Sequence, residues 1–258
     1  MKHRILFVAV ALWLQSALFA QLKDATISVG IIPGMGYRAI SYKGSFSSQY
    51  KDSIARTDKW KASVGFSAMV GIPAGEKNRI FVGLQFQNYG FTRRKEPIRF
   101  LDTIHPDIGV RNDLAQTGSD YVDFNYRYQY LSIPFLFSSQ LSGKKLKSVT
   151  LHALFGGSLS ARVNHDIRAV LHGFSMADNQ KVFRLEDKSA QPALFNGNLH
   201  FALRLENKIY GKHTYVFAQP TIYLPLLVAN YGVERYHLYS VGVEVGIMFR
   251  PVKDKKQE

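Results

Sequence analysis

Residues 60–72 read WKASVGFSAMVGI, and this run decides the fold class. Every second residue in it is apolar: Trp60, Ala62, Val64, Phe66, Ala68, Val70 and Ile72. The residues between them are small or polar, apart from Met69. Because successive side chains of a β-strand point to opposite faces, the run predicts a strand with one apolar face. A tilted strand crosses a bilayer in roughly 9–11 residues, so a run of this length is long enough.

The same period-two alternation recurs in seven other segments, namely residues 27–31, 80–87, 121–141, 149–160, 199–206, 213–224 and 240–249. Within residues 121–141 the apolar positions change from even to odd near Tyr130 and Leu131, which predicts a β-bulge there. Residues 213–224 contain Pro220 and alternate poorly on both faces, which leaves the bounds of that strand open.

The connections between these segments alternate in length. Residues 73–78, 142–147 and 210–213 are short and turn-like, whereas residues 41–58, 96–118, 164–196 and 225–235 are long and polar. Outer-membrane barrels have short periplasmic turns and long outer loops. The pattern predicts an all-β fold, a closed antiparallel transmembrane β-barrel of about eight strands. A soluble β-sandwich or lipocalin-like fold is the alternative, but neither explains the alternation or the large apolar faces opposed by Gly, Ser, Gln and isolated charges.

The N-terminus predicts export. Lys2 and Arg4 precede an apolar run at residues 5–14, and small residues lead to Ala20. This is typical of a signal peptide, residues 1–20, cleaved near Ala20. An uncleaved anchor helix is the alternative, but the run is about half of the ~20 residues that a spanning helix needs. Residues 21–258 are then expected to form a single outer-membrane β-barrel domain, with a short basic tail at residues 250–258.

Composition limits the chemistry and the partners. The chain of 258 residues has no cysteine, which excludes disulfides and thiol chemistry, and it carries a net charge of +14. Nucleic acid is not an expected partner outside the cytoplasm. The excess positive charge is expected to face outer-membrane lipids, both lipopolysaccharide and inner-leaflet phospholipid. A periplasmic or secretion-machinery protein with an acidic surface is the other partner considered.

Charged residues opposite the apolar faces predict a polar network in the lumen, made by Arg127, Arg162, Arg204, Glu206 and Glu244. An eight-stranded barrel has an interior that side chains can fill, and buried charges need partners. The network is therefore expected to plug the core, with a gated polar path for small solutes as the alternative. Aromatic residues near strand ends suggest interfacial girdles, although strands favour aromatics in general. They are Tyr37, Trp60, Tyr89, Tyr126, Tyr128, Tyr130, Tyr210, Tyr236 and Tyr239.

Two further basic sets are candidate lipid contacts. The turns and the tail would form a basic periplasmic rim that includes Lys144, Lys145, Lys147, Lys212, Lys253, Lys255 and Lys256. At the outer end of the third strand, Arg93, Arg94 and Lys95 could hold the phosphates of lipid A through charge-assisted pairs. An ordinary solvated loop base explains this triplet equally well.

No catalytic, cofactor or metal site is predicted. Ser158, Ser160, His165, Asp166 and His172 lie close in the sequence, but their spacing does not bring a serine, a histidine and an acid to one face. The remaining histidines are isolated, so a metal centre has no support. The sequence therefore predicts a non-enzymatic barrel. A lipid-modifying enzyme of the outer membrane and a narrow solute channel remain alternatives.

Three segments resemble one family. Residues 130–137 read YLSIPFLF and resemble the Y-L-E-I-P-hydrophobic strand of the PorT-like outer-membrane β-barrel family of Bacteroidota. Residues 154–160 (LFGGSLS) and the glycine-punctuated closing strand at 240–249 are similar to that family too. The resemblance implies a Gram-negative outer-membrane barrel, with a possible accessory or anchoring role in type IX protein secretion. Ser132 stands where the family usually has an inward acid, and nine residues follow the last aromatic, Phe249.

Overall fold

The computed structural model describes residues 25–43, 57–95, 121–141, 149–172, 182–185, 192–210, 213–231 and 234–250. These contain nine strands: β1 (Thr26–Tyr42), β2 (Asp58–Pro73), β3 (Asn78–Lys95), β4 (Tyr121–Gln140), β5 (Val149–His172), β6 (Val182–Leu185), β7 (Phe195–Tyr210), β8 (Thr214–Pro225) and β9 (Glu234–Phe249). No helix within these ranges is long and apolar enough to cross a membrane. The predicted signal peptide lies outside the described residues.

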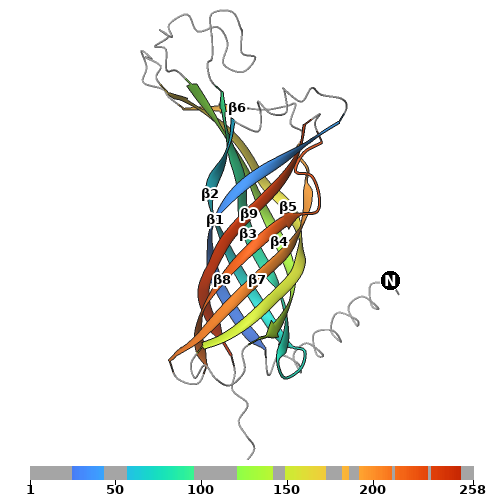
Figure 1. Ribbon diagram of the computed structural model, residues 1–258, viewed down its shortest axis with the longest axis vertical. Coiled ribbons are helices and arrows are strands. Elements are labelled where there is room, and N and C mark those ends of the chain that lie inside the picture. The colour runs from blue at the N-terminus through green and yellow to red at the C-terminus, as the bar shows by residue number, and fades with distance from the viewer. Residues whose placement is uncertain are drawn as a thin grey trace, which may run out of the picture.

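Eight of the strands close into a ring (Figure 1). Each pairs antiparallel with its neighbours in the order β1-β2-β3-β4-β5-β7-β8-β9, and the ring closes because β1 also pairs with β9. The short strand β6 stands outside the ring and pairs with residues 167–170 of β5. The predicted closed antiparallel transmembrane barrel of eight strands is confirmed.

The two ends of the barrel differ. One end carries the start of β1, the end of β9 and the short β2–β3 connection, and we call it the short-turn end. At the other, long-loop end, β3, β4 and β5 rise above the rest of the wall (Figure 1). β5 is 24 residues long and continues to His172, well into the region predicted as a loop. Its residues 167–170 pair antiparallel with β6, so part of the segment predicted as a loop is strand that extends beyond the ring.

The predicted bulge in β4 is wrong. Its even-numbered residues face inward without interruption from Val122 to Ser138. A register shift does occur in the β4–β5 pairing between Gln129 and Tyr130, but the extra residue is Val163 on β5. The apolar positions of β4 change parity because the environment changes along a regular strand.

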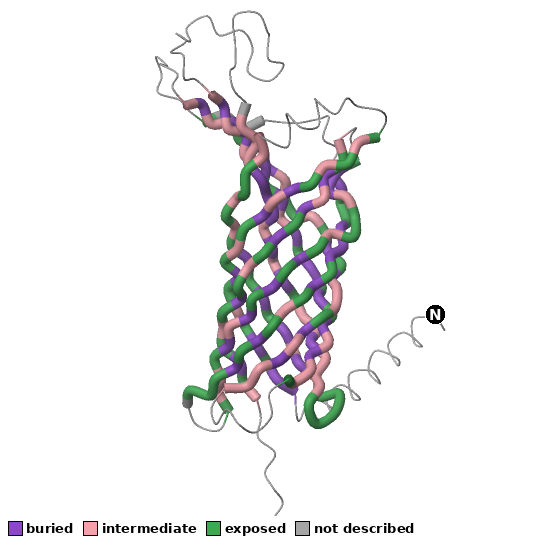
Figure 2. Tube along the Cα trace, in the orientation of Figure 1, coloured by how far each residue is buried: buried purple, intermediate pink, exposed green. Residues whose placement is uncertain are grey.

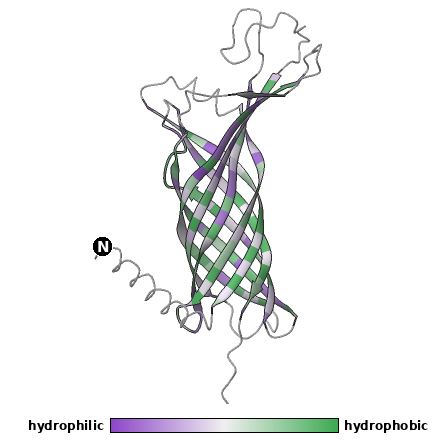
Figure 3. Cartoon of the chain, turned by 180° about the vertical axis from the view of Figure 1, so that it is seen from behind, coloured by the Kyte–Doolittle hydropathy of each residue, from purple (hydrophilic) through white to green (hydrophobic). Residues whose placement is uncertain are grey.

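That change is an inversion of polarity along the barrel wall. From Leu131 to Phe135 the outward residues of β4 are exposed and apolar, and inward Ser132 is buried. Above Leu131 the outward residues are Gln129, Arg127, Asn125 and Asp123, while the inward ones are Tyr130, Tyr128, Tyr126 and Phe124. Figure 2 shows the alternation of buried and exposed residues, and Figure 3 shows hydrophobic residues on the body of the wall. We call the part of the barrel between the short-turn end and Leu131 the lower barrel, and the part between Gln129 and the long-loop end the upper part. The exterior of the lower barrel is apolar and suits lipid, whereas the exterior of the upper part is polar and suits water.

Candidate functional site: the barrel lumen and its two ends

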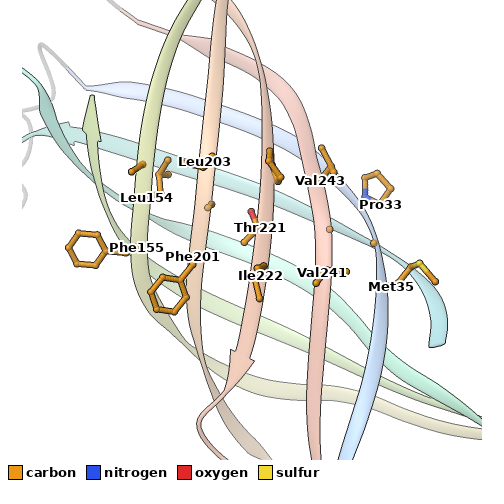
Figure 4. Close-up of a pocket in the computed structure, with 15 residues that line it drawn as sticks. Pro33, Met35, Leu154, Phe155, Phe201, Leu203, Thr221, Ile222, Val241 and Val243 are labelled. Carbon is orange, nitrogen blue, oxygen red and sulfur yellow. The ribbon is translucent and has the colours of Figure 1, made fainter. Parts of the chain in front are cut away.

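The outer wall of the lower barrel is apolar all around. Exposed residues of this belt include Ile27, Val29, Ile31, Phe66, Leu84, Ile133, Phe155, Leu203, Ile222, Val243 and Ile247. On one side the wall is hollowed into an open groove of about 890 Å³, across β1, β9, β8, β7 and β5 (Figure 4). Pro33 and Pro220 flank Val243 there, in register across three strands. The groove is almost entirely apolar, so it suits lipid chains and offers no groups for chemistry.

Inside the barrel, the short-turn end is closed by charged side chains. The carboxylate of Glu206 on β7 accepts a hydrogen bond from Nη2 of Arg250 at 2.6 Å, and Nε2 of His152 lies 3.4 Å from the same oxygen. The guanidinium of Arg250 also lies over the ring of Tyr215, 4.7 Å from its centroid. Arg250 is the residue that follows β9, so the start of the C-terminal tail is tied to the lumen.

A second carboxylate lies deeper in the lumen. Glu244 on β9 is fully buried and accepts hydrogen bonds from Ser67 Oγ at 2.5 Å and from Gln219 Nε2 at 3.4 Å. The amide oxygen of Gln219 accepts from Nε of Arg204 at 2.6 Å. Gln219 therefore links the predicted residues Arg204 and Glu244. An amide between a cation and an anion lets both be buried without a direct ion pair.

The middle of the lumen holds neutral polar groups. Ser158 Oγ and His200 Nε2 are 2.8 Å apart, Ser132 and Ser160 share a hydrogen bond of 2.7 Å, and Gln85 donates to the hydroxyl of Tyr223 at 3.1 Å. A small void of about 10 Å³ lies nearby, which is at the lower limit of the space for one water. Polar side chains from β3, β4, β5, β7 and β8 therefore meet in the middle of the lumen.

The long-loop end is closed by a second charged cluster. Arg38 of β1 donates two hydrogen bonds to Asp58, from Nε at 2.7 Å and from Nη2 at 2.8 Å. Its guanidinium carbon lies 3.8 Å from the centroid of Phe91 and 4.4 Å from that of Tyr236. Arg93 joins this pair to Glu234, 3.5 Å from Asp58 and 3.1 Å from Glu234. We call Arg38, Asp58, Arg93 and Glu234 the upper cluster; its formal charges cancel.

Of the five predicted lumen residues, the structure brings three together: Arg204, Glu206 and Glu244. Arg162 faces inward near the long-loop end, where it donates to the carbonyl of Pro192 rather than to an acid. Arg127 does not belong to the lumen. It is exposed on the outer face of β4, opposite Asp166, because β4 lacks the bulge that would have turned it inward.

The predicted lipid A triplet divides between the two faces of β3. Arg93 points inward to the upper cluster with 12% of its side chain exposed, so it does not contact lipid as predicted. Arg94 makes a bidentate pair with Asp123, at 2.8 and 3.1 Å, and lies over the ring of Tyr121. Burial alone would raise the pKa of Asp123, but the hydrogen bonds from Arg94 outweigh burial and hold it below its ordinary value. Lys95 pairs in β3 through its backbone.

All seven lysines of the predicted basic rim lie outside the described residues, because these leave out residues 142–148, 211–212 and 251–258. The aromatic girdle is correct only in part. Trp60 and Tyr239 are exposed on the wall, and Tyr37 stacks on Trp60 with ring centroids 5.0 Å apart. Five of the other tyrosines are instead buried in the upper core, namely Tyr89, Tyr126, Tyr128, Tyr130 and Tyr236.

Sequence reasoning missed the Ser158–His200 pair, since the two residues lie 42 positions apart on different strands. The available signal was that Ser158 and His200 both occupy positions opposite the apolar face of their strands, which are adjacent in the barrel. Both side chains are buried in the lumen, and no hydrogen bond joins His200 to a carboxylate in the described part of the chain. His165 faces the ring of Tyr128, whereas Asp166 pairs with Arg168. Among the described residues no group of three or more His, Asp or Glu could hold a metal ion.

Comparisons with known proteins add nothing beyond a general likeness. No protein-family model and no curated protein matches the sequence. Among solved structures, the attachment invasion locus protein Ail of Yersinia pestis in complex with a heparin analogue is 11% identical (TM-score 0.35; 88% of this chain, 99% of that one). Neisserial surface protein A is 10% identical (TM-score 0.41; 88% and 96%), and the outer membrane protease OmpT of Escherichia coli 8% (TM-score 0.38; 88% and 96%). Likenesses this distant carry no argument about activity, so the fold rests on the strand pairings.

Proposed function

We propose that this chain is a non-enzymatic outer-membrane β-barrel that anchors a rigid extension of its strands, with the connecting loops, on the outer side of the membrane. The inversion of polarity between Gln129 and Leu131 on β4 carries the proposal. A wall that is apolar outside and polar inside suits lipid, and the opposite arrangement above it suits water. The long-loop end is then the outer side, since outer-membrane barrels have their long loops there.

The extension is built as a surface for contacts rather than as a loose loop. Its interior is an aromatic core around Tyr126, Tyr128 and Phe91, closed by the upper cluster. Its exterior presents exposed Arg127 and half-exposed Arg168, and the Arg94–Asp123 pair. A packed core keeps such a surface in one shape, which lowers the entropic cost of binding a partner. Arg127 and Arg168 also replace Arg93 as candidate contacts for lipid A phosphates.

Hydrogen-bonded polar and charged side chains inside the barrel disfavour a channel function. Purified protein in planar bilayers is expected to give no discrete current steps, because Arg204, Gln219, Glu244 and Glu206 occupy the path through the lower barrel. Reproducible steps in wild-type protein would contradict the anchoring function and favour the solute channel. The variant Arg204→Gln serves to assign any such steps to the lumen.

We extend the proposal, on the PorT-like resemblance alone, to an accessory role in protein export. Ser132, which stands at the family's acidic position, hydrogen-bonds Ser160 inside the lumen, so no luminal charge is available there for a shared mechanism. Deletion of the gene is expected to leave exported proteins in the periplasm, and the wild-type gene to restore their release. A variant with Arg127→Gln and Arg168→Gln is expected to fold but restore release poorly. Normal release in the deletion strain would end the export role and leave the barrel untouched.

A further inference from the structure

The short-turn end of the lumen carries more positive than negative charge. Three arginines gather there, Arg79 on β3, Arg204 on β7 and Arg250 after β9, and each interacts electrostatically with the others. The facing carboxylates are those of Glu206 and Glu244. With both ionised, one guanidinium is left without a counter-charge among the described residues of this end. An excess charge in a low-dielectric interior is costly unless something neutralises it.

Arg204 shows where the missing charge would sit. Its side chain is fully buried between the rings of Phe81 and Phe217, 4.4 and 4.5 Å from their centroids. Nε donates to Gln219, a neutral amide. Nη1 and Nη2 are both buried and have no hydrogen-bond partner within the part of the chain that the structure describes. A buried donor without a partner destabilises the folded state, and more so when the group is charged, so native proteins normally satisfy it.

The neighbouring arginines have unused donors of the same kind. Nη1 of Arg79 and Nε of Arg250 are also buried, and neither has a hydrogen-bond partner among the described residues. Arg250 is also the most accessible member, with 22% of its side chain exposed beside the short-turn end. Arg79, Arg204 and Arg250, from three different strands or strand ends, therefore bring unused donors to the short-turn end, where Arg250 reaches solvent. The two terminal nitrogens of a guanidinium match two oxygens of a carboxylate or phosphate.

We infer that this end of the lumen binds one small oxyanion, a free carboxylate or phosphate, held by Nη1 and Nη2 of Arg204 with Arg79 and Arg250 beside it. Because Arg204 is fully buried between two aromatic rings, we expect only a small ion to reach it. The ion would neutralise the extra guanidinium and hold Arg250, at the start of the C-terminal tail, against the lumen. This site is independent of the proposed contacts on the outer side, at the opposite end of the barrel.

The test uses the full-length protein, purified in a neutral maltoside detergent. Urea unfolding is followed by far-ultraviolet circular dichroism in formate, phosphate or chloride at equal ionic strength. An ion that binds only the folded state at a hundred times its Kd lowers the apparent unfolding constant about a hundredfold. Formate or phosphate is expected to raise the unfolding midpoint well above the value in chloride, and the more effective of the two identifies the class of oxyanion.

Two variants locate the effect. Arg204→Gln is expected to abolish the difference in unfolding midpoint between oxyanion and chloride, whereas the matched control Arg235→Gln, exposed on β9 at the other end, keeps it. If Arg204→Gln does not fold, Arg79→Gln is used instead. The effect of the oxyanion on its unfolding constant is expected to be at least tenfold smaller than in the wild type. An equal midpoint in all three salts for wild-type protein would overturn the inference, as would an undiminished oxyanion effect in the arginine variant that folds.

Discussion

Replacement of Asp58 by asparagine removes one carboxylate from the upper cluster and leaves its shape almost unchanged. In the wild type, Asp58 accepts two hydrogen bonds from Arg38 and lies 3.5 Å from Arg93. The side chains of Arg38 and Asp58 are 0% and 2% exposed, so water cannot replace the lost charge. After the substitution, two arginines share the single carboxylate of Glu234.

The expected cost is large because the remaining charge is buried. Breaking a buried pair by removing one partner costs about 3–5 kcal/mol, against about 0–1 kcal/mol for an exposed pair. Since about 1.4 kcal/mol is a factor of ten, the unfolding constant of Asp58→Asn should rise roughly a hundredfold to several thousandfold. Urea unfolding of the purified protein in detergent, followed by circular dichroism, measures this directly.

A second substitution separates the charge from the packing. Arg38→Met together with Asp58→Asn removes both members of the pair and leaves Arg93 paired with Glu234. Methionine fits among Phe91, Tyr126 and Tyr236, so the double variant should regain most of the stability that Asp58→Asn loses. Asp123→Asn at the same end is the control, because the Arg94–Asp123 pair is more exposed, at 27% and 14%. A loss of less than about 1 kcal/mol in the free energy of unfolding of Asp58→Asn would refute the reasoning. A double variant that is less stable than both Asp58→Asn and Arg38→Met alone would refute it too.

Three other predictions concern the wall and the extension. Phe135→Arg in the lipid-facing belt should cost about 2–4 kcal/mol in lipid vesicles, whereas Gln129→Arg, above the belt, should cost close to nothing. Gly83→Ala should destabilise by about 1–3 kcal/mol because its Cβ would lie 2.1 Å from the carbonyl oxygen of Ala68, whereas Gly197→Ala meets only ordinary contacts; urea midpoints compare the two. Since the folded-state pKa of Asp123 is depressed, its ion pair stabilises above the ordinary value of 3.8 and is lost as pH falls through the lowered pKa. The stability difference between wild type and Asp123→Asn should therefore vanish in acid, and a difference that grows in acid would contradict the assignment.

The strands were predictable from the sequence because a membrane wall imposes a strict period of two. Residues 60–72 face outward and inward as expected, and each of the eight wall strands overlaps one predicted segment, although several, β1, β5 and β9 among them, are longer than predicted. The height of the wall was not predictable in this way. Above the lipid boundary the apolar face turns inward, and on β4 this change looks the same in sequence as a bulge. The wrong choice between the two moved Arg127 into the lumen.

The candidate site was predictable only where the interacting residues lie on one strand or both occupy inward-facing positions of their strands. Arg204, Glu206 and Glu244 follow from inward positions on β7 and β9. Arg93 was misassigned because its partner Glu234 is 141 residues away, and no local pattern reveals that contact. Gln219, which connects Arg204 to Glu244, lay in the segment with the weakest alternation.

The most direct test of the account is the accessibility of single cysteines along β4, in a chain that has none of its own. Cysteines replace Arg127, Gln129, Leu131, Ile133 and Phe135 one at a time, and intact cells are treated with a membrane-impermeant maleimide. Labelling is expected at 127 and 129, with protection at 131, 133 and 135. Uniform labelling of all five positions, or protection of 127 and 129 together with the rest, would contradict a barrel that passes from lipid into water between Leu131 and Gln129.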